Sequence, residues 1–495
     1  MARWMWASMA VVLWGTVLAA CRREEPSRRP EPFTREAGET APRREPEVPL
    51  HLSPPTRPTQ EPLQAWGTYR TGRIDPRVLE VPAEIQRGIF RKPEKYVEPL
   101  VSFLIDEARD DFHKAKLLHD WVAQNIEYDV EGYFTGDYKR SGTGFADTLR
   151  RGSSVCNGYA GLFEHMCSLA GLECVKISGY GRGYGHRLFR PEDPTKGNHA
   201  WNAVKIAGNW HLMDITWDAG HIADTREYTR RYRTDFLFLE PEKFLHTHFP
   251  TEAKWQLLAA PLSSDEFLDL PCLRGEFFGL GLDLAEPVAA LTQAGESTTL
   301  ELLVPEGVRL RAHVTTPDDE EVPNLTFIEG GQGAARIRAL FPRAGKWKLR
   351  LYARAEATGD RGGGAGTGGD RGLGTKRAMG DGSEMFEGVA DLAYEATAGT
   401  DQRFPQAFGQ YDSLGCWLVE PRFAPLPVGQ PTRFALDVPT VSGVAVYQDD
   451  VWTMLERGEG DRWTGSATPG RGGPVRVVVR LRPEDRQWES ILQYD

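Results

Sequence analysis

The sequence predicts an α+β domain followed by two β-sandwich domains. Apolar residues recur with the helical period through much of residues 76–170, whereas beyond residue 270 they alternate along short segments. Short alternating segments joined by Pro, Gly and Asp turns are typical of antiparallel sandwiches. With 495 residues, 40% of them apolar, the chain is long enough to build two to four domains with separate cores.

Helical segments are predicted from residue 76 to residue 171. They cover 82–90, 96–109, 110–128 and 145–151, and the third has an apolar stripe at Leu117, Leu118, Trp121, Val122 and Ile126. A further helix begins at Cys156 and ends at Gly171, with apolar positions at Val155, Tyr159, Leu162, Phe163, Met166 and Leu169. This last helix therefore carries a cysteine at its N-terminus.

Residues 199–217 are predicted to form a β-hairpin. Its first strand alternates from His199, Gly208-Asn209 supplies the turn, and the chain returns as far as Trp217. In this register His199 and Asp214 point to the same face, but Asp218 is the residue directly opposite His199. Because twist or a bulge shifts a register, the spacing leaves Asp214 and Asp218 both open.

These residues are the parts of an activated cysteine nucleophile: a thiol at Cys156, an imidazole at His199 and a nearby carboxylate. A free thiol titrates at about 8.5 and needs a neighbour that favours the thiolate, which a helix N-terminus and an imidazolium both do. The imidazolium can then protonate a leaving amine, while the carboxylate fixes its tautomer. The backbone N–H of Cys156 is a candidate oxyanion donor.

Three motifs carry a family resemblance: Cys156-Asn157-Gly158-Tyr159-Ala160, His199-Ala200-Trp201 and Trp210-His211-Leu212-Met213-Asp214. With segment 119–129 they resemble the transglutaminase-like superfamily. Segment 246–258 and the β-rich region after it are similar to the kyphoscoliosis peptidase-like branch. The resemblance implies a transglutaminase-like (papain-like) core with Cys156 as nucleophile, His199 as base and acid, and Asp214 as the residue that orients His199.

Two groups of strands are predicted after residue 270. The first group is 299–304, 308–314, 325–328, 335–341 and 347–353, and the second is 416–421, 433–438, 443–448, 452–455, 463–467 and 475–482. A tight turn at 341–346 is expected to deliver Trp347 into the core. Two immunoglobulin-like sandwiches are the favoured interpretation, and one larger β domain is the alternative.

The N-terminus resembles a lipoprotein signal. An apolar run from Met5 to Leu18 is too short to span a bilayer, and Leu18-Ala19-Ala20-Cys21 resembles a bacterial lipobox. We expect Cys21 to be lipidated and to anchor the protein to a membrane of the bacterial cell envelope, with an outer-membrane or periplasm-facing location. Residues 22–75 are rich in Pro and in charges of both signs, which predicts a disordered tether.

The predicted organisation is therefore a sequence of five parts: 1–20 signal peptide, 21–75 tether, 76–270 catalytic domain, 271–400 β-sandwich with a Gly-rich disordered insertion at 356–384, and 401–495 second β-sandwich.

Composition excludes some functions and leaves others open. A formal charge of −11 argues against general nucleic-acid binding. Four further cysteines allow three disulfide connectivities between which the sequence cannot choose, although burial is expected for the first two; they are Cys167, Cys174, Cys272 and Cys416. His246 and His248 lack an accompanying ligand cluster in the sequence, so no metal and no cofactor are expected.

The loop 179–198 precedes His199 and is rich in Gly, Pro and Arg. Because loops carry binding residues disproportionately, Tyr180, Tyr184 and Arg187 are candidate substrate contacts. The sequence as a whole favours a cysteine peptidase or amide hydrolase acting on proteins or peptides. The alternatives are a protein cross-linking transglutaminase, a non-catalytic binding lipoprotein that uses its β-sandwiches, and a peptidoglycan amidase.

Overall fold

The structure of the protein is a computed structural model that describes residues 65–190, 193–223, 225–330, 333–356 and 386–495. The predicted signal peptide, the predicted lipidation site Cys21, most of the predicted tether and residues 357–384 of the predicted insertion lie outside these residues. Among the described helices, none combines the length and apolar character needed to cross a membrane.

The folded chain begins before the predicted end of the tether. The 3₁₀ helix η1 (Ala65–Tyr69) contains the buried Tyr69, whose hydroxyl donates to Asp110 at 2.7 Å. Arg70 donates to the backbone carbonyl of Asp235 at 3.0 Å. The end of the predicted tether is therefore part of the folded domain, because its side chains find partners that composition does not reveal.

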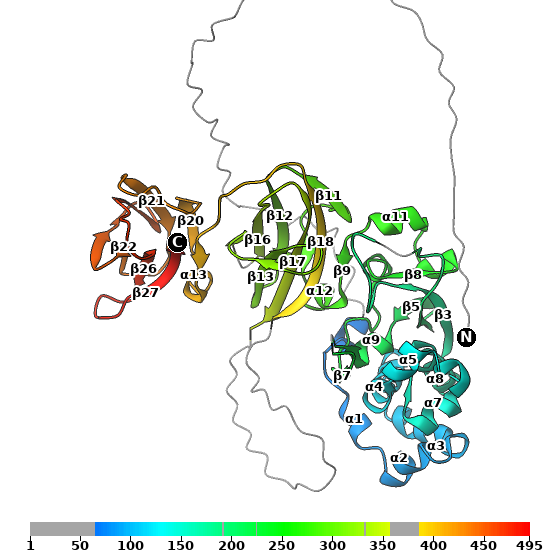
Figure 1. The fold of residues 1–495 in the computed structure, drawn as a ribbon. Helices are drawn as coiled ribbons and strands as arrows, with labels where there is room; N and C mark the ends of the chain where they lie inside the picture. Colours follow the sequence, from blue (N-terminus) through cyan, green and yellow to red (C-terminus); the bar gives the residue numbers. More distant parts are fainter. Residues whose placement is uncertain (1–64, 191–192, 224, 331–332, 357–385) are drawn as a thin grey trace, which may run out of the picture. The chain divides into compact units, whose positions relative to one another are not determined.

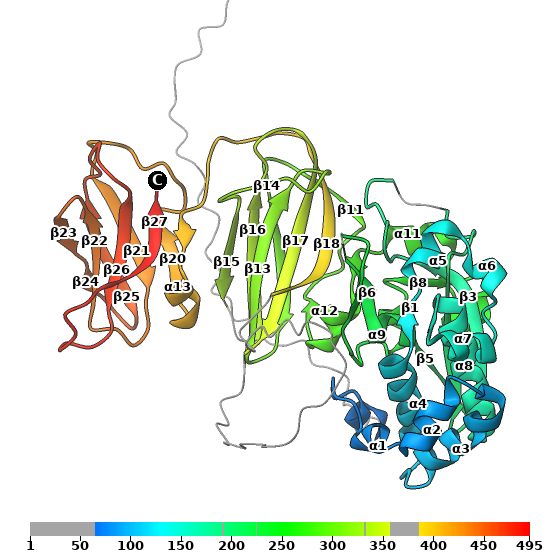
Figure 2. The same ribbon diagram turned by 60° about the horizontal axis from the view of Figure 1, so that its bottom comes forward.

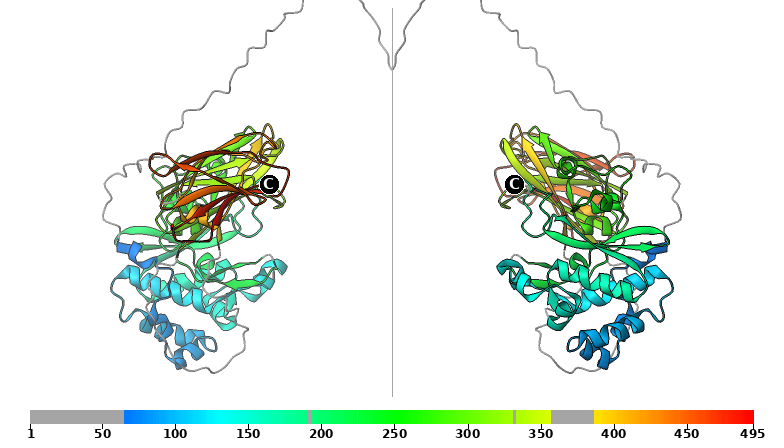
Figure 3. Two further views of the ribbon diagram at one scale, coloured as in Figure 1. Left: turned by 90° about the vertical axis from the view of Figure 1, so that its left-hand side faces the viewer. Right: turned by 90° about the vertical axis from the view of Figure 1, so that its right-hand side faces the viewer.

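A group of helices, blue to cyan in Figure 1, forms the first part of the domain. They are α1 (Pro76–Leu79), α2 (Ala83–Ile89), α3 (Pro93–Ile105), α4 (Asp111–Asn125), α5 (Val130–Thr135), α6 (Tyr138–Ser141), α7 (Phe145–Arg151) and α8 (Cys156–Leu169). The predicted helices are confirmed, and α8 stops because Gly171 adopts a φ of 73°. Both views of Figure 3 show these helices gathered together. Their shared core includes Leu100, Leu118, Trp121, Leu162 and Phe163.

One antiparallel sheet positions the site. Its order is β5-β4-β3-β8, built from β3 (Glu173–Gly181), β4 (His199–Ile206), β5 (Asn209–Met213) and β8 (His248–Pro250). Helix α8 is tied to this sheet by Asn202, whose amide donates to the carbonyl of Ala160 at 3.0 Å. Two small ribbons and four short helices complete the domain: β1 (Glu127–Tyr128) with β2 (Ser153–Ser154), β6 (Gly220–Ile222) with β7 (Tyr228–Arg230), α9 (Ile215–Ala219), α10 (Pro241–Phe244), η2 (Ala253–Gln256) and α11 (Ser264–Asp269).

The described residues from Cys272 onward form four sheets, which confirms the predicted β-sandwich fold (Figure 2). The first two have the orders β10-β12-β16-β15 and β11-β18-β17-β13-β14, with β9 paired to β18. Their strands, with helix α12 (Gly275–Gly279), are β9 (Cys272–Leu273), β10 (Asp283–Leu284), β11 (Leu291–Ala294), β12 (Ser297–Val304), β13 (Val308–Thr315), β14 (Glu321–Val322), β15 (Thr326–Gly330), β16 (Gly333–Leu340), β17 (Gly345–Ala355) and β18 (Glu387–Ala396). Trp347 is 2% exposed, as the predicted turn before it requires.

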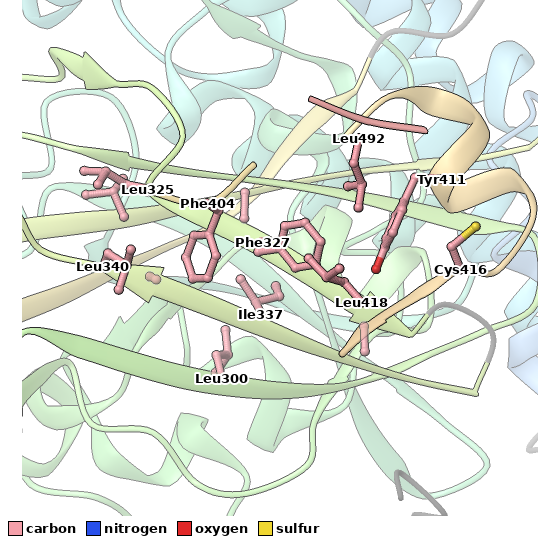
Figure 4. Close-up of a cluster of buried hydrophobic side chains, with 14 of the residues drawn as sticks. Leu300, Leu325, Phe327, Ile337, Leu340, Phe404, Tyr411, Cys416, Leu418 and Leu492 are labelled. Carbon is pink, nitrogen blue, oxygen red and sulfur yellow. The ribbon is translucent and has the colours of Figure 1, made fainter. Parts of the chain in front are cut away.

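The other two sheets have the orders β19-β27-β26-β22-β23 and β20-β21-β25-β24. Their strands, with helix α13 (Gly409–Ser413), are β19 (Gln406–Ala407), β20 (Trp417–Glu420), β21 (Thr432–Asp437), β22 (Gly443–Gln448), β23 (Val451–Met454), β24 (Glu456–Arg457), β25 (Arg462–Ala467), β26 (Val475–Arg480) and β27 (Glu489–Tyr494). Figure 4 shows part of the apolar core that these sheets share with the preceding ones. Within this core the Phe327 ring centre lies 5.6 Å from that of Phe404 and 5.4 Å from that of Tyr411.

Candidate active site

The candidate nucleophile, Cys156, is the first residue of α8. The residue before it, Val155, is extended and provides no side-chain cap, so the first-turn N–H groups keep their preference for an anion. Gly158 lets the helix start lie close to β2, since a Cβ at Gly158 would come within 2.0 Å of the Ser154 hydroxyl oxygen. Cys156 is half-buried, which leaves its thiol at the edge of the protein interior.

The hairpin that carries His199 turns one residue earlier than predicted. Its turn is Ala207-Gly208, with φ values of 50° and 85°, and Ile206 pairs with Asn209. Positive φ at both central residues matches the right-handed twist of the strands. The returning strand ends at Met213 instead of continuing to residue 217 as predicted.

The aspartate that follows this strand caps a short helix. Oδ1 of Asp214 accepts from the N–H groups of Thr216 at 2.8 Å and Trp217 at 3.3 Å, which begins α9. Oδ2 of Asp214 lies 2.6 Å from Nε2 of His199. The structure therefore pairs His199 with Asp214, whereas Asp218 lies within α9 and contacts a different histidine.

The three groups form a relay. Because Nε2 of His199 is bonded to Asp214, Nδ1 is the nitrogen left for the Cys156 thiol, which lies against the same imidazole. Burial lowers the pKa of His199, but the Asp214 carboxylate and the Cys156 sulfur outweigh it and raise that pKa to about 10. Burial disfavours the ionised Asp214, yet His199 and His248 hold its pKa well below the usual range. At neutral pH the pair is therefore an imidazolium beside a carboxylate.

A second histidine binds the same carboxylate. Nε2 of His248 lies 3.1 Å from Oδ2 of Asp214, and Nδ1 lies 2.8 Å from the Thr247 hydroxyl. Burial lowers the pKa of His248 to about 4, so it is neutral and donates through Nε2. Its ring is enclosed by Trp201, Trp217, Phe236 and Phe244. The sequence analysis considered His248 only as a metal ligand and missed this contact.

The fold separates His246 from this centre and brings His199, Asp214 and His248 together. His246 bonds the backbone carbonyl of Pro271 at 2.9 Å. The ligand atoms of the three grouped residues lie within 4.8 Å of one another, a spacing that a metal ion also accepts. The two contacts to Asp214, at 2.6 and 3.1 Å, are hydrogen-bond lengths that account for the cluster without an ion.

A buried ion cluster supports α9 from the side of α4. Both nitrogens of His119 face carboxylates: Nδ1 lies 3.0 Å from Asp120 and Nε2 lies 3.1 Å from Asp218. All three side chains are fully buried. Carboxylates only accept hydrogen bonds, so both nitrogens donate and His119 is an imidazolium. Burial opposes this charge, but the two carboxylates outweigh it and raise the pKa of His119.

Replacing His119 with leucine should destabilise the protein by roughly 3 kcal/mol at pH 7, because Asp218 would lose its cationic partner in a dry interior and Asp120 would keep only Lys116. The midpoint of urea unfolding, followed by tryptophan fluorescence, measures this. Lys114→Ala is the control on the same helix, since Lys114 forms only a surface pair with Asp111 and should change stability by about 0.5 kcal/mol or less. Equal stability of His119→Leu and wild type would contradict the imidazolium assignment.

A cavity of about 580 Å³ opens beside His199. Tyr184 lines it, as expected of a substrate contact. Tyr180 instead is 2% exposed and packs against Phe267, because its strand position faces the core. Arg187 is exposed and lies outside the residues that line the cavity. Only one of the three candidate contacts therefore faces this cavity.

The cysteines among the described residues are free thiols. Cys167, Cys272 and Cys416 are buried, and Cys174 is half-buried. Burial raises the pKa of Cys167 well above its usual value, which keeps that thiol protonated. Packing is therefore the role of Cys167, as predicted.

Comparison with known proteins identifies two of the domains. Residues 100–215 match the family described as the transglutaminase-like superfamily, and residues 264–361 match the family described as the KY-like, immunoglobulin-like domain. The chain is 37% identical over 262 residues to kyphoscoliosis peptidase of Mus musculus, covering 52% of this chain and 38% of that protein. The corresponding Homo sapiens protein is 35% identical over 265 residues, covering 53% and 39%.

Hillarin of Drosophila melanogaster is 27% identical over 257 residues, which cover 48% of this chain and 29% of that protein. The chain thus spans less than two-fifths of the length of each of these relatives. The matches confirm the predicted core: the chain contains a transglutaminase-like domain followed by a KY-like immunoglobulin-like domain.

Proposed function

We propose that this protein is a cysteine-dependent amide hydrolase that acts on proteins or peptides. The observation that carries the proposal is the relay in which Asp214 holds Nε2 of His199 at 2.6 Å while the Cys156 thiol lies against the same ring. A buried carboxylate that orients a histidine, which in turn faces a thiol at a helix N-terminus, is the arrangement of an activated nucleophile. The peptidase names of the mouse and human relatives support the same reaction class.

The first half-reaction would form a thioester. The thiolate of Cys156, beside the His199 imidazolium that already carries a proton on Nδ1, attacks the carbonyl carbon of the scissile amide. The backbone N–H of Cys156 is positioned at the start of α8 to stabilise the oxyanion. His199 then donates its Nδ1 proton to the leaving amine as the C–N bond breaks, which leaves the acyl group on sulfur and His199 neutral.

The second half-reaction decides between two products. Water that attacks the thioester, with its proton taken by the neutral His199, gives a carboxylic acid and restores the Cys156 thiolate beside the His199 imidazolium. A lysine amine in place of water gives an isopeptide cross-link. The relay serves both routes equally, and the peptidase names of the relatives favour water.

Incubation of the purified chain with a mixture of unfolded proteins tests the proposal. New N-termini, detected by amine labelling and mass spectrometry, would support a peptidase. Ammonia release with incorporation of a primary amine would favour a transglutaminase instead. If neither product forms and Cys156→Ala leaves the biological role unchanged, the proposal fails and the β-sandwiches become the working part of a binding protein.

We also propose, from the sequence alone, that the protein is held at a membrane of the bacterial cell envelope through Cys21. Leu18-Ala19-Ala20-Cys21 resembles a lipobox, and more than one acyl chain on one residue gives stable anchoring. Cys21→Ser should move the protein from the membrane fraction to the soluble fraction of expressing cells. An unchanged distribution would contradict the anchor.

A further inference from the structure

Three exposed aromatic side chains gather near the cavity beside His199. Tyr133, Phe134 and Tyr184, here called the aromatic rim, are 38%, 41% and 43% exposed. The Phe134 ring lies 5.2 Å from Tyr133 and 5.6 Å from Tyr184, edge to face in both cases. Large aromatic rings at a protein surface lose the benefit of burial, so a cluster of them marks a place where something apolar binds.

The rim is held in place by its own backbone. Asp129 caps α5 by accepting from the N–H of Gly132 at 2.8 Å, and Gly136 ends the helix in the left-handed conformation. The guanidinium of Arg226 covers the Phe134 ring at 4.9 Å. Because the helix that carries Tyr133 and Phe134 has both ends fixed, the rings are presented in a defined arrangement.

The rim continues into the candidate active site. Tyr133 and Tyr184 line the same cavity as His199, Trp217 and Tyr128. The rings of Tyr128 and Tyr133 lie 6.0 Å apart. The cavity therefore has aromatic residues both at its rim and beside the catalytic histidine, where the rings of Trp217 and His199 stack 5.0 Å apart.

Strand pairing brings Tyr128 next to the nucleophile. β1 and β2 are parallel, with Tyr128 paired to Ser154, two residues before Cys156. The N–H of Asp129 donates to the carbonyl of Ser154 at 3.0 Å and locks this register. A substrate acyl group bound at Cys156 would have its neighbouring side chain over Tyr128 and the rim.

The charged groups that line the same cavity are paired within the chain. Arg231 and Arg233 both bond Glu387, and Arg274 donates to Asp391 at 2.6 Å. A further arginine, Arg182, donates to three backbone carbonyls, those of His246, Phe267 and Leu270. These arginines already have partners within the chain. To bind an acidic side chain of the substrate, an arginine would first have to give up one of these hydrogen bonds. Binding of an apolar side chain to the aromatic rim breaks none of these hydrogen bonds.

We infer that the aromatic rim is a specificity subsite that accepts a large apolar side chain, preferably aromatic, of the polypeptide substrate close to the scissile bond. This inference rests on the proposed function, because it names the side chain that the same cleft takes. Edge-to-face contacts with Phe134 and Tyr184 would add to the burial of such a side chain. Discrimination between Phe and Ala by a pocket of this kind is about 10-fold or more.

Binding to a full-length Cys156→Ala variant tests the subsite independently of turnover. The probes are two hexapeptide amides, one of alanine only and one with a single Phe at its third position, titrated by calorimetry. We expect the Phe peptide to bind about 10-fold more tightly, and Phe134→Ala and Tyr184→Ala added to the same variant to abolish that difference. Trp452→Ala, which removes an exposed aromatic ring on β23 outside the cavity, is the matched control and should leave it intact.

A cleavage assay with the active enzyme separates the two claims. A library of synthetic 14-residue peptides should be cut preferentially within three residues of Phe, Tyr, Trp or Leu, and this preference should vanish in Phe134→Ala. Equal binding of both hexapeptides overturns the subsite, whether or not the library is cut. Tighter binding of the Phe peptide without any cleavage retains the subsite and overturns the proposed hydrolysis.

Discussion

A Cys156→Ala variant should fold like the wild type and lose amide hydrolysis by a factor of about 10⁴ or more. The sulfur is the atom that forms the covalent bond to the substrate, and removal of a nucleophile from a coupled relay eliminates most of the catalysis that the relay provides. The change leaves the fold intact because Cys156 is half-buried at the first position of α8, where alanine is well tolerated. Stability should change by about 1 kcal/mol or less.

The matched control is a second cysteine on the same helix. Cys167→Ala removes a fully buried sulfur, so it should lower stability by about 1 kcal/mol and leave the activity of the folded protein unchanged. Iodoacetamide should modify Cys156 faster than Cys167, and His199→Ala should remove this advantage. New N-termini produced at the wild-type rate by Cys156→Ala would place the nucleophile elsewhere.

The parts of the site that local sequence determines were predictable. The apolar period and the terminating Gly171 place Cys156 at the start of a helix, and alternation from His199 predicts a strand there. These signals are local, because each depends on residues within one element. The helix and strand therefore agree between sequence and structure, with small differences at their ends.

The register of the hairpin was not predictable from the same signals. The turn requires Ala207 to adopt a φ of 50°, a conformation that residues with a Cβ seldom take, so the pattern favoured Gly208-Asn209. The alternating pattern of the predicted strand continues through residues 210–217. This pattern does not indicate that the strand ends before Asp214, which caps a helix. The chain turns into a helix here because one oxygen of Asp214 accepts hydrogen bonds from two backbone N–H groups, those of Thr216 and Trp217.

Partners distant in the sequence were missed for a different reason. His248 is 34 residues from Asp214, and His119 is 99 residues from Asp218. Only the pairing of β8 with β3 and the packing of α4 on α9 bring these groups together. Isolated histidines in a sequence carry no signal for such contacts, whereas Asp214 could be favoured over Asp218 because the family motif includes it.

Asp214→Asn should reduce the rate of hydrolysis by about 10³ to 10⁴ and move the alkaline limit of activity to lower pH. Burial lowers the pKa of His199, but the Asp214 carboxylate, together with the Cys156 sulfur, raises it to about 10. An amide at the same place has no charge, so the pKa of His199 should fall, because only the Cys156 sulfur would then oppose the effect of burial. The imidazolium, which protonates the leaving amine, would therefore be lost at a lower pH than in the wild type.

The same pKa predicts how stability depends on pH. A group whose pKa is higher in the folded than in the unfolded state stabilises the fold fully below its unfolded pKa, and loses this contribution as pH rises through the folded value. For His199 that window runs from about 6.5 to about 10. Wild-type stability should therefore fall across it more steeply than that of Asp214→Asn, with urea midpoints at pH 6.5, 8 and 9.5 as the measurement.

The control must remove one carboxylate without touching the relay. Asp265→Asn meets this need, because Asp265 is exposed on α11, and the variant should keep the wild-type profile of kcat/KM from pH 5 to 10.5. If Asp214→Asn keeps its alkaline limit near pH 10, the Cys156 sulfur must be the group that holds the proton on His199, because His248 is neutral. If the alkaline limit of kcat/KM falls in Asp214→Asn but not in Asp265→Asn, the Asp214 carboxylate is the group that keeps His199 protonated. Acid catalysis by His199 at neutral pH requires this protonated state.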